Sequence, residues 1–573
     1  MTTFVARPTN RQNANAARMT TALSFWRLLV LAGIFGLFVL LIVGRLATLA
    51  LFEGSRAYGA TNSSYVPVRG DIIDRNGVPL ARTIRAYAIW VKPAALLGDR
   101  RKLAQDLSII FPDTPEDKFY AKLTAKEPGY LRKRALPEQV RQVHNLGEIA
   151  IEFPREDERL YPQHDLAAHV LGYVAPGGTG ALGMERVMDS KLRGEPVELS
   201  IDVRVQAALE QELARGMKST AAKGAAGVIL DVRTGEVIAM ASLPSFNPNF
   251  PNFADERTQA ADIAAGKTPI DHQVNTVTNR VFELGSTFKP LTVAAALDAG
   301  TVRNLAIRYD ATAPIEISGF KIRDTHPSGR WLNTPEALVH SSNIVTARIA
   351  DNLGREKMEA MLRTLEFDKR PRIELAERSR PVWPKSWGRV TNMTIGYGHG
   401  MAVTPLHLAT GYAAMVNGGI FRPATLFKVP KGKKIPGKRV FAAATSARMR
   451  QLLRMIVVDG TGKNADANGY RVGGKTGSAE KPGVGGYARN LVVSTFAAAF
   501  PMDNPRYIII AMLDEPKGTA ESGFQRTAGW TSAPVVNRTV MRIGPQLGIF
   551  PDTHRDVDVS ELMPLLWSPK GKT

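Results

Sequence analysis

Three short clusters of hydroxyl, amine and amide side chains could carry out nucleophilic chemistry. The first pairs Ser286 with Lys289, three positions further along the chain. Gly285 before the pair and the alanine-rich run after it predict the start of a helix, on which positions three apart share a face. A serine hydroxyl needs an adjacent base, and a lysine amine serves as one when burial or a nearby cation keeps it partly neutral. The pair therefore predicts a serine nucleophile with a lysine base.

The same Ser-x-x-Lys spacing occurs twice more, at Ser318 to Lys321 and at Ser478 to Lys481. Ser318 lies in a turn-like stretch, whereas Ser478 lies on a predicted strand, where residues three apart point to opposite faces. Only Ser286 opens a helix. The spacing alone is weak evidence, and the local context selects Ser286 as the candidate nucleophile.

The second cluster is Ser341-Ser342-Asn343, at the start of another predicted helix, and the third is Lys475-Thr476-Gly477 with Ser478, on a predicted strand. Taken singly, Ser341 and Asn343 have the ordinary explanation of a helix cap, and Lys475 that of a surface charge. Together and in this order, the three clusters form the serine–lysine acyl-transfer set, whose middle motif is Ser-Asp-Asn in other members. The sequence therefore predicts an acyltransferase.

Composition limits the other classes of function. The chain has 573 residues, 44% of them hydrophobic and 22% charged, which is typical of globular packing over several domains. The absence of cysteine excludes disulfide scaffolds, thiolate metal sites and cysteine nucleophiles. The histidines show no metal-binding spacing, so we expect neither a metal nor a cofactor.

The net charge of +21 favours acidic partners such as nucleic acid, anionic lipid or an acidic wall polymer. A solvated basic surface is an equally good explanation. No run of consecutive basic residues is interleaved with aromatic ones, so we do not expect nucleic acid to be the partner.

An uncharged apolar run from Leu28 to Gly44 resumes after Arg45 and continues to Leu51. A helix needs roughly 20 residues to cross the hydrocarbon of a membrane. The preceding residues include arginines but no acidic residue, so the positive-inside rule predicts a cytoplasmic segment 1–27, a transmembrane anchor 28–51 and an extracytoplasmic remainder. The alternative is a cleaved signal peptide, whose apolar stretch is usually only about 7 to 15 residues.

Residues 52–199 mix strand-like runs such as 86–91 with helical stretches at 99–110 and 137–145, and they carry no catalytic cluster. We interpret this part as a non-catalytic, elongated α+β domain, called the pedestal below. It is expected to contact partners rather than substrate.

The pattern changes at about residue 200. A hairpin at 227–241, a helix-rich middle and three late strands at 470–479, 491–500 and 506–513 predict an α/β fold with an antiparallel five-stranded sheet flanked by helices. We assign residues 200–545 to the catalytic domain and residues 546–573 to a poorly patterned C-terminal tail.

Along nearly the whole chain the sequence resembles the class B penicillin-binding proteins, membrane-anchored D,D-transpeptidases that cross-link peptidoglycan. Phe282-Glu283 before the nucleophile and Asn343 in the second motif resemble the cell-division type more than the elongation type. Leu284 replaces the family's usual proline and His407 its common glutamine. The remaining motifs that carry the resemblance are residues 69–77, 159–162, 167–172, 183–185, 200–206, 243–249, 396–400 and 403–406.

The resemblance implies a fold like that of the penicillin-binding proteins and serine β-lactamases. It also implies that Ser286 attacks the carbonyl between the last two D-alanines of a stem peptide, that Lys289 takes its proton, and that β-lactams acylate the same serine. Ser341 and Asn343 would relay the proton and orient groups, and Lys475 would add positive field. Substrate binding would fall to Thr476, Gly477 and Ser478, with an oxyanion hole from the N–H groups of Ser286 and Ser478.

The implied location is the inner membrane, crossed once, with the catalytic domain in the periplasm. The implied partners are a membrane glycosyltransferase of the septum (FtsW-type) and other divisome proteins. An elongation-type transpeptidase, a D,D-carboxypeptidase or β-lactamase, and a penicillin-responsive sensor share the motifs and stay open as alternatives. Because no positioned glutamate can be nominated to activate water, we expect slow β-lactam hydrolysis. His399 is not expected to act as a general base.

Overall fold

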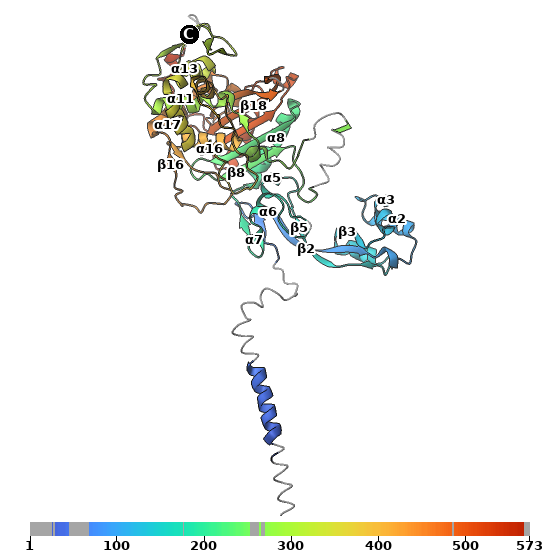
Figure 1. The fold of residues 1–573 in the computed structure, drawn as a ribbon. Coiled ribbons are helices and arrows are strands. Elements are labelled where there is room, and N and C mark those ends of the chain that lie inside the picture. The colour runs from blue at the N-terminus through green and yellow to red at the C-terminus, as the bar shows by residue number, and fades with distance from the viewer. Residues whose placement is uncertain are drawn as a thin grey trace, which may run out of the picture. The chain divides into compact units, whose positions relative to one another are not determined.

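The computed structural model describes residues 26, 29–44, 68–175, 177–251, 263–264, 270–483 and 486–566. The chain divides into two units, residues 1–67 and 68–573, which are treated separately. In the first unit residues 29–44 form a helix with exposed side chains (blue in Figure 1). No helix within the described ranges is both long and apolar enough to cross a membrane. Residues 28 and 45–51 of the predicted anchor, and the cytoplasmic segment apart from Trp26, lie outside those ranges.

The pedestal is built on a mixed sheet. Its strand order is β3-β2-β1-β6, with β4 and β5 also pairing with the long strand β2, so that β2 holds the domain together. A separate apolar cluster that includes Leu107 and Phe119 lies between β2, β3 and helices α2 and α3. The elements are β1 (Ile72–Ile73), β2 (Pro79–Val91), η3 (Pro93–Ala95), α2 (Arg100–Ile110), α3 (Glu116–Leu123), β3 (Gly129–Ala135), α4 (Pro137–His144), β4 (Ile151–Glu152), β5 (Arg155–Leu160), α5 (Ala168–Leu171), α6 (Gly183–Val187), α7 (Asp189–Leu192) and β6 (Val197–Glu198).

Three of the pedestal motifs found in the sequence meet at the buried carboxylate of Glu185. Arg69 Nε donates to it at 2.6 Å and Arg159 Nε at 2.7 Å. The Glu185 side chain has no exposed surface, so its charge is stabilised by these two guanidinium groups rather than by water. Motifs more than 100 residues apart in the chain thus share one ion-pair cluster.

The first pedestal motif also binds the start of the catalytic domain. Asp74 is fully buried, and its carboxylate accepts hydrogen bonds from the backbone N–H groups of Asn76, Val78 and Val203. The side chain of Asn76 in turn donates to Asp202 at 3.0 Å. This tight turn therefore joins the pedestal to the first turn of α8.

The catalytic domain contains the predicted five-stranded antiparallel sheet, in the order β17-β18-β19-β7-β8. Its strands are β7 (Gly224–Asp231), β8 (Val237–Leu243), β17 (Gly473–Gly483), β18 (Gly486–Phe500) and β19 (Tyr507–Asp514). The strand expected to begin at Tyr470 begins at Gly473, because the φ of Arg471 is 50° and turns the chain just before it. Strands β17 and β18 also extend beyond the predicted ends as a hairpin.

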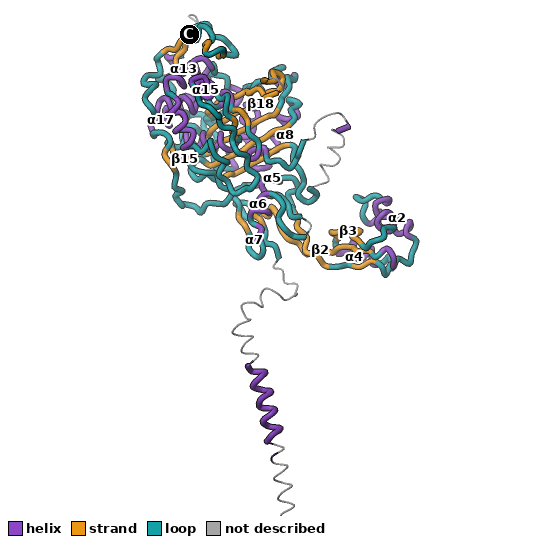
Figure 2. The backbone as a smooth tube through the Cα atoms, in the orientation of Figure 1, coloured by secondary structure: helices purple, strands orange, loops and turns teal. Residues whose placement is uncertain are grey.

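Helices cover both faces of this sheet (Figures 1 and 2). Along β19, Ile508 and Ile510 belong to one apolar core, whereas Ile509 and Ala511 belong to the other. The first core includes residues of α11, α16 and α17, and the second includes residues of α8 and α18. Because successive side chains of a strand point to opposite faces, those of β19 pack against two different layers of helices.

The helices of the catalytic domain carry two of the three motifs. They are α8 (Val203–Ser219), α10 (Thr276–Asn279), α11 (Lys289–Asp298), α12 (Thr334–Val339), α13 (Asn343–Leu353), α14 (Arg355–Thr364), α15 (Arg389–Gly396), α16 (Pro405–Val416), α17 (Ala443–Asp459) and α18 (Ser532–Gln546), with the 3-10 turns η4 (Gly285–Thr287), η5 (Lys463–Ala465) and η6 (Ala520–Ser522). Short strands pair outside the main sheet: β9 (Phe282–Glu283), β10 (Arg308–Asp310), β11 (Ile315–Ile317), β12 (Phe320–Ile322), β13 (Trp331–Asn333), β14 (Ala402–Val403), β15 (Ile420–Phe421) and β16 (Lys438–Arg439).

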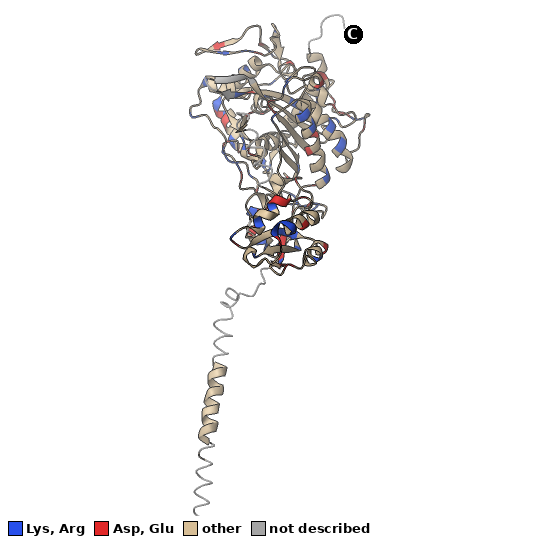
Figure 3. Ribbon diagram, turned by 90° about the vertical axis from the view of Figure 1, so that its right-hand side faces the viewer, with Lys and Arg blue, Asp and Glu red and all other residues tan. Residues whose placement is uncertain are grey.

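The segment after α18 packs on the domain although its sequence shows little pattern. Leu562 is buried in the main core, and Asp556 binds the guanidinium of Arg454 on α17 at 2.6 Å. One 3-10 turn, η7 (Met563–Leu565), lies near the end of the described chain. Figure 3 shows Lys and Arg spread over the pedestal and the catalytic domain with acidic residues among them, rather than gathered into one stripe.

Candidate active site

Ser286 lies on the 3-10 turn η4, and the α-helix that follows begins at Lys289. The predicted helix start therefore has a tighter first turn. Tyr412 of α16 fixes this turn, since its hydroxyl donates to the carbonyl of Thr287 at 2.7 Å. Phe288 is fully buried beneath it. Ser286 itself is half-buried, so its hydroxyl combines a fixed backbone with access from outside.

The backbone just before Ser286 is held by the segment that follows α15. Gly285 N–H donates to the carbonyl of Gly398 at 3.0 Å, and a Cβ on Gly398 would lie only 2.1 Å from the Gly285 oxygen. The carboxylate of Glu283 accepts from the N–H of Gly400 and lies 3.0 Å from His399 Nδ1. His399 therefore helps to hold the segment that precedes Ser286.

The three predicted motifs converge on the hydroxyl of Ser341. Lys289 Nζ lies 3.1 Å from this oxygen and Lys475 Nζ lies 3.0 Å from it. Lys289 also donates to the main-chain oxygen of Ser341. Both lysine side chains are 0% exposed, so each amine depends on protein partners for its hydrogen bonds.

Burial changes the acidity of both amines. It lowers the pKa of Lys289 well below its usual value, and the neighbouring Lys475 cation lowers that pKa further, while the carboxylate of Asp324 opposes the change. Burial also lowers the pKa of Lys475 to about 7. A neutral amine is therefore available near neutral pH, as a lysine base requires.

Lys289 and Ser286 are close in sequence, but in the described residues no hydrogen bond joins their side chains. The amine of Lys289 is directed to Ser341. In apo enzymes catalytic hydrogen bonds are often long and tighten only when substrate binds. The amine of Lys289 is therefore held in place by Ser341.

Strand β17 supplies the third motif. Gly477 has no side chain, and a Cβ there would lie 2.7 Å from Thr287 Cγ2, so glycine lets β17 approach η4, the turn that bears Ser286. Thr476 Oγ1 shares a hydrogen bond of 2.8 Å with Thr461. Ser478 is exposed, and its hydroxyl accepts from the N–H of Ala528 at 3.1 Å.

The second motif begins α13 in a way that the sequence did not predict. The capping residue is Ser342 rather than Ser341 or Asn343, and its hydroxyl accepts from Val345 N–H at 3.1 Å. Asn343 Nδ2 donates to the carbonyl of Arg323 at 2.9 Å. Ser341 is thereby free of the capping role, and its φ is 61°.

Two polar residues of the site were missed from the sequence, Asp324 and Thr461. Asp324 accepts from the Ser342 hydroxyl at 2.7 Å, and Thr461 contacts Thr476. Neither belongs to a short motif, and each meets its partner only through the fold. No sequence spacing could have indicated them.

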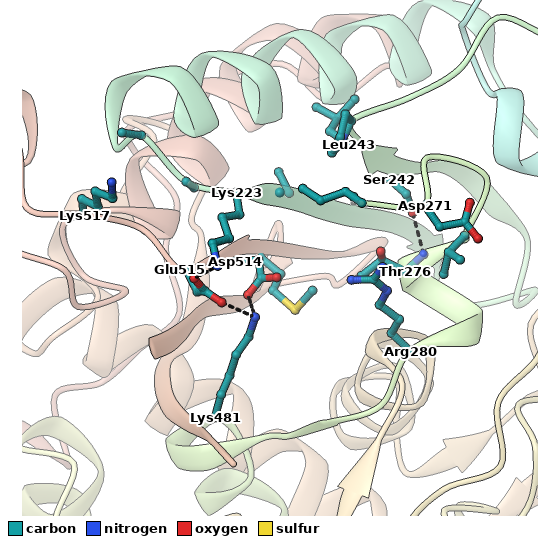
Figure 4. Close-up of a pocket in the computed structure, with 18 residues that line it drawn as sticks. Lys223, Ser242, Leu243, Asp271, Thr276, Arg280, Lys481, Asp514, Glu515 and Lys517 are labelled. Carbon is teal, nitrogen blue, oxygen red and sulfur yellow. Dashed lines mark hydrogen bonds and ion pairs between the residues drawn. The ribbon is translucent and has the colours of Figure 1, made fainter. Parts of the chain in front are cut away.

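A cavity of about 660 Å³ lies at the ends of β7, β8 and β19, beside Lys481 (Figure 4). Its charges largely neutralise one another, since Lys481 pairs with Asp514 and Glu515, and Lys223 with Glu515. It contains no residue of the three motifs. We therefore place the chemistry at the Ser341 cluster and not in this cavity.

Comparisons with known proteins agree with the geometry. The family model described as "Penicillin-binding Protein dimerisation domain" matches residues 64–225, and "Penicillin binding protein transpeptidase domain" matches residues 225–540. The probable peptidoglycan D,D-transpeptidase FtsI of Caulobacter vibrioides is 37% identical over 537 residues, covering 91% of this chain and 87% of that protein. The peptidoglycan D,D-transpeptidase FtsI of Escherichia coli K12 is 28% identical, covering 94% and 95%.

Solved structures give the same result. Penicillin binding protein 3 of Mycobacterium tuberculosis, complexed with aztreonam, superposes with a TM-score of 0.64 at 25% identity, covering 85% of this chain and 97% of that one. The fold and the matched domains define a penicillin-binding transpeptidase preceded by a dimerisation domain, and the chain belongs to this family. Within the family it is a class B penicillin-binding protein of the FtsI type.

Proposed function

We propose that Ser286 is the nucleophile with which this chain, a serine-type peptidoglycan D,D-transpeptidase of the septal class, cross-links stem peptides. The observation that carries the proposal is the convergence of Lys289 and Lys475 on the Ser341 hydroxyl, directly beside the turn that bears Ser286. An amine whose pKa is lowered by burial is the base that a serine hydroxyl needs.

In the acylation step Ser286 Oγ attacks the carbonyl carbon of the penultimate D-alanine, and its proton passes to the neutral amine of Lys289. The C–N bond to the terminal D-alanine breaks, and this residue leaves with a proton as the free amino acid. A Ser286 ester remains. The Ser341 hydroxyl, hydrogen-bonded to both lysines, provides the route by which protons move between them.

In the second step the amine of a neighbouring stem peptide attacks the ester carbonyl, and its proton returns through Lys289 to restore the Ser286 hydroxyl. The N–H groups of Ser286 and Ser478 form the oxyanion hole, in which a donor contributes about 2.7–4 kcal/mol in comparable sites. Thr476 and Ser478 bind the substrate carboxylate, and Asn343 orients the peptide. Gly477 keeps β17 close enough for these contacts.

Residues 52–199 form the pedestal, 200–545 the catalytic domain and 546–573 a tail. Residues 28–51 anchor the chain in the inner membrane as a single span, with residues 1–27 in the cytoplasm and the rest in the periplasm. The charge pattern around the apolar run supports this orientation. The pedestal contacts a septal membrane glycosyltransferase and other divisome proteins, and β-lactams act as substrate mimics that acylate Ser286.

The nucleophile is tested by intact-mass spectrometry after incubation with benzylpenicillin. Ser286→Ala should show no penicilloyl adduct, whereas the parental chain gains one. The matched control is Ser318→Gly, which removes the hydroxyl of another Ser-x-x-Lys match and suits the positive φ of 49° at that turn. Undiminished labelling of Ser286→Ala would reject the assignment. Multiple turnover of penicillin by the parental chain would indicate a hydrolase instead.

A further inference from the structure

Asp324 follows the short strand β12 and is a buried residue, 7% exposed. Both of its carboxylate oxygens are used by the first turn of α13. Oδ2 accepts from the Ser342 hydroxyl at 2.7 Å, and Oδ1 accepts from the N–H of Ile344 at 3.0 Å. A carboxylate at a helix N-terminus is stabilised by the unpaired N–H groups there. Asp324 therefore clamps the start of α13.

The clamp acts directly on the residue next to Ser341. Ser341 has a left-handed backbone, with φ of 61°, which costs a non-glycine residue about 1 kcal/mol and persists only where the surroundings enforce it. Ser342 is held by Asp324, and its N–H donates to the carbonyl of Ala337 at 2.8 Å. Asn343 is held by the carbonyl of Arg323. The segment 323–324 thus fixes both residues that follow Ser341.

The charge of Asp324 also affects the amine of Lys289. The charged groups that act on Lys289 are Lys475, from β17, and Asp324, from the segment after β12. The negative charge of Asp324 therefore acts on Lys289, where it raises the pKa against the effects of burial and of the Lys475 cation.

We propose that Asp324 is a positioning residue for acyl transfer, which fixes Ser341 between Lys289 and Lys475 and supplies a negative charge that acts on the amine of Lys289. This inference rests on the proposed function of Ser286 and Lys289. Asp324 does not touch the reacting atoms and acts through Ser342 and Ser341.

The test uses the full chain and the rate of acylation by a fluorescent penicillin, measured from pH 5 to pH 9, together with thermal unfolding. Asp324→Asn keeps the shape and one acceptor oxygen but removes the charge, and Asp324→Ala removes both. We expect the acylation rate to fall roughly tenfold in Asp324→Asn and further in Asp324→Ala. Because the charge raises the pKa of Lys289, the acidic limb of the Asp324→Asn profile should move to lower pH.

Asp310→Asn is the matched control. Asp310 ends β10, and its carboxylate accepts hydrogen bonds from Thr312 and lies 3.8 Å from the guanidinium of Arg348 on α13, an exposed pair of the kind that contributes little to stability. This variant should keep the parental rate and profile. An Asp324→Asn variant with an unchanged rate, with an unmoved acidic limb, or with a loss explained entirely by unfolding would overturn the inference. If the parental chain fails to acylate at Ser286, the proposed function fails instead, so the two failures are distinguished.

Discussion

Ser341 and Lys475 are 134 residues apart in the chain, yet the hydroxyl of one lies 3.0 Å from the amine of the other. One residue contributes from the loop before α13 and the other from the edge strand β17. Lys289 reaches the same hydroxyl from α11. The alignment of the two amines therefore depends on α11, on β17 and on the left-handed backbone of Ser341. We therefore expect acyl transfer to depend on these tertiary contacts around Ser341.

The rate of acylation should follow a bell-shaped pH profile. On the acidic side it rises as Lys289 loses its proton, which occurs below the usual lysine range because the pKa is lowered. On the alkaline side it falls as pH rises through about 7, because Lys475 then loses the charge that serves the substrate carboxylate. Since the two amines interact, the limbs report the pair and not single residues.

The Lys475→Arg variant tests whether Lys475 causes the alkaline limb of this pH profile. The guanidinium keeps its charge throughout this range, so the alkaline fall should disappear, with a lower absolute rate because arginine is larger than the buried lysine it replaces. Stopped-flow acylation by a chromogenic cephalosporin measures both effects. A Lys475→Arg profile that still falls above pH 7 would assign the alkaline limb to another group.

Ser341→Ala should slow acylation by about ten- to a hundredfold, because two buried amines lose the hydroxyl that connects them, and an unsatisfied buried group costs about 1–3 kcal/mol. Penicillin acylation under single-turnover conditions provides the measurement. Ser219→Ala, which removes a hydroxyl at the end of α8 that bonds only to Gly216, is the control and should keep the parental rate. Equal rates for both variants would show that Ser341 takes no part in proton transfer.

Much of the fold of the catalytic domain could be predicted because its strands and turns are recognisable in short stretches of sequence. The alternating strands of the sheet and the glycine-bearing turn between β7 and β8 are visible in short windows, and the structure confirms the five antiparallel strands. The ends of the strands are less well predicted. The positive φ of Arg471, for example, cannot be inferred from the apolar pattern of the sequence around it. The turn assigned to Ser318 is likewise found between β11 and β12.

The candidate site residues came from motifs with recognisable spacings. The structure brings Lys289 and Lys475 within hydrogen-bonding distance of the Ser341 hydroxyl, and Ser286 lies on the turn just before Lys289. Asp324 meets Ser342 from a segment 18 residues away, and the hydrogen bond from Gly400 N–H to Glu283 spans 117 residues. Such supporting contacts depend on the packing of whole elements and have no local pattern.

Glu185→Gln should destabilise the protein strongly without altering the acyl-transfer site. The variant leaves the guanidinium groups of Arg69 and Arg159 without their buried carboxylate, and breaking a buried pair costs about 3–5 kcal/mol. Thermal unfolding should show a clearly lower midpoint, while the folded fraction acylates at the parental rate. Glu198→Gln is the control, since its pair with Lys428 is surface-exposed and is worth at most about 1 kcal/mol. A midpoint for Glu185→Gln equal to that of Glu198→Gln would contradict the structural role.

Gly477→Ala should impair acylation more than it impairs folding. The added Cβ would lie 2.7 Å from Thr287 Cγ2 and 2.9 Å from the Leu284 oxygen, so β17 must move away from the turn that bears Ser286. A displacement of the order of 1 Å at such a distance can cost about a hundredfold in rate. Gly129→Ala on β3 is the matched control, because its Cβ meets nothing within 4 Å. We expect that control to acylate normally with an unfolding midpoint close to the parental one. If Gly477→Ala acylated as fast as Gly129→Ala, the close approach of β17 to the nucleophile turn would have no catalytic role.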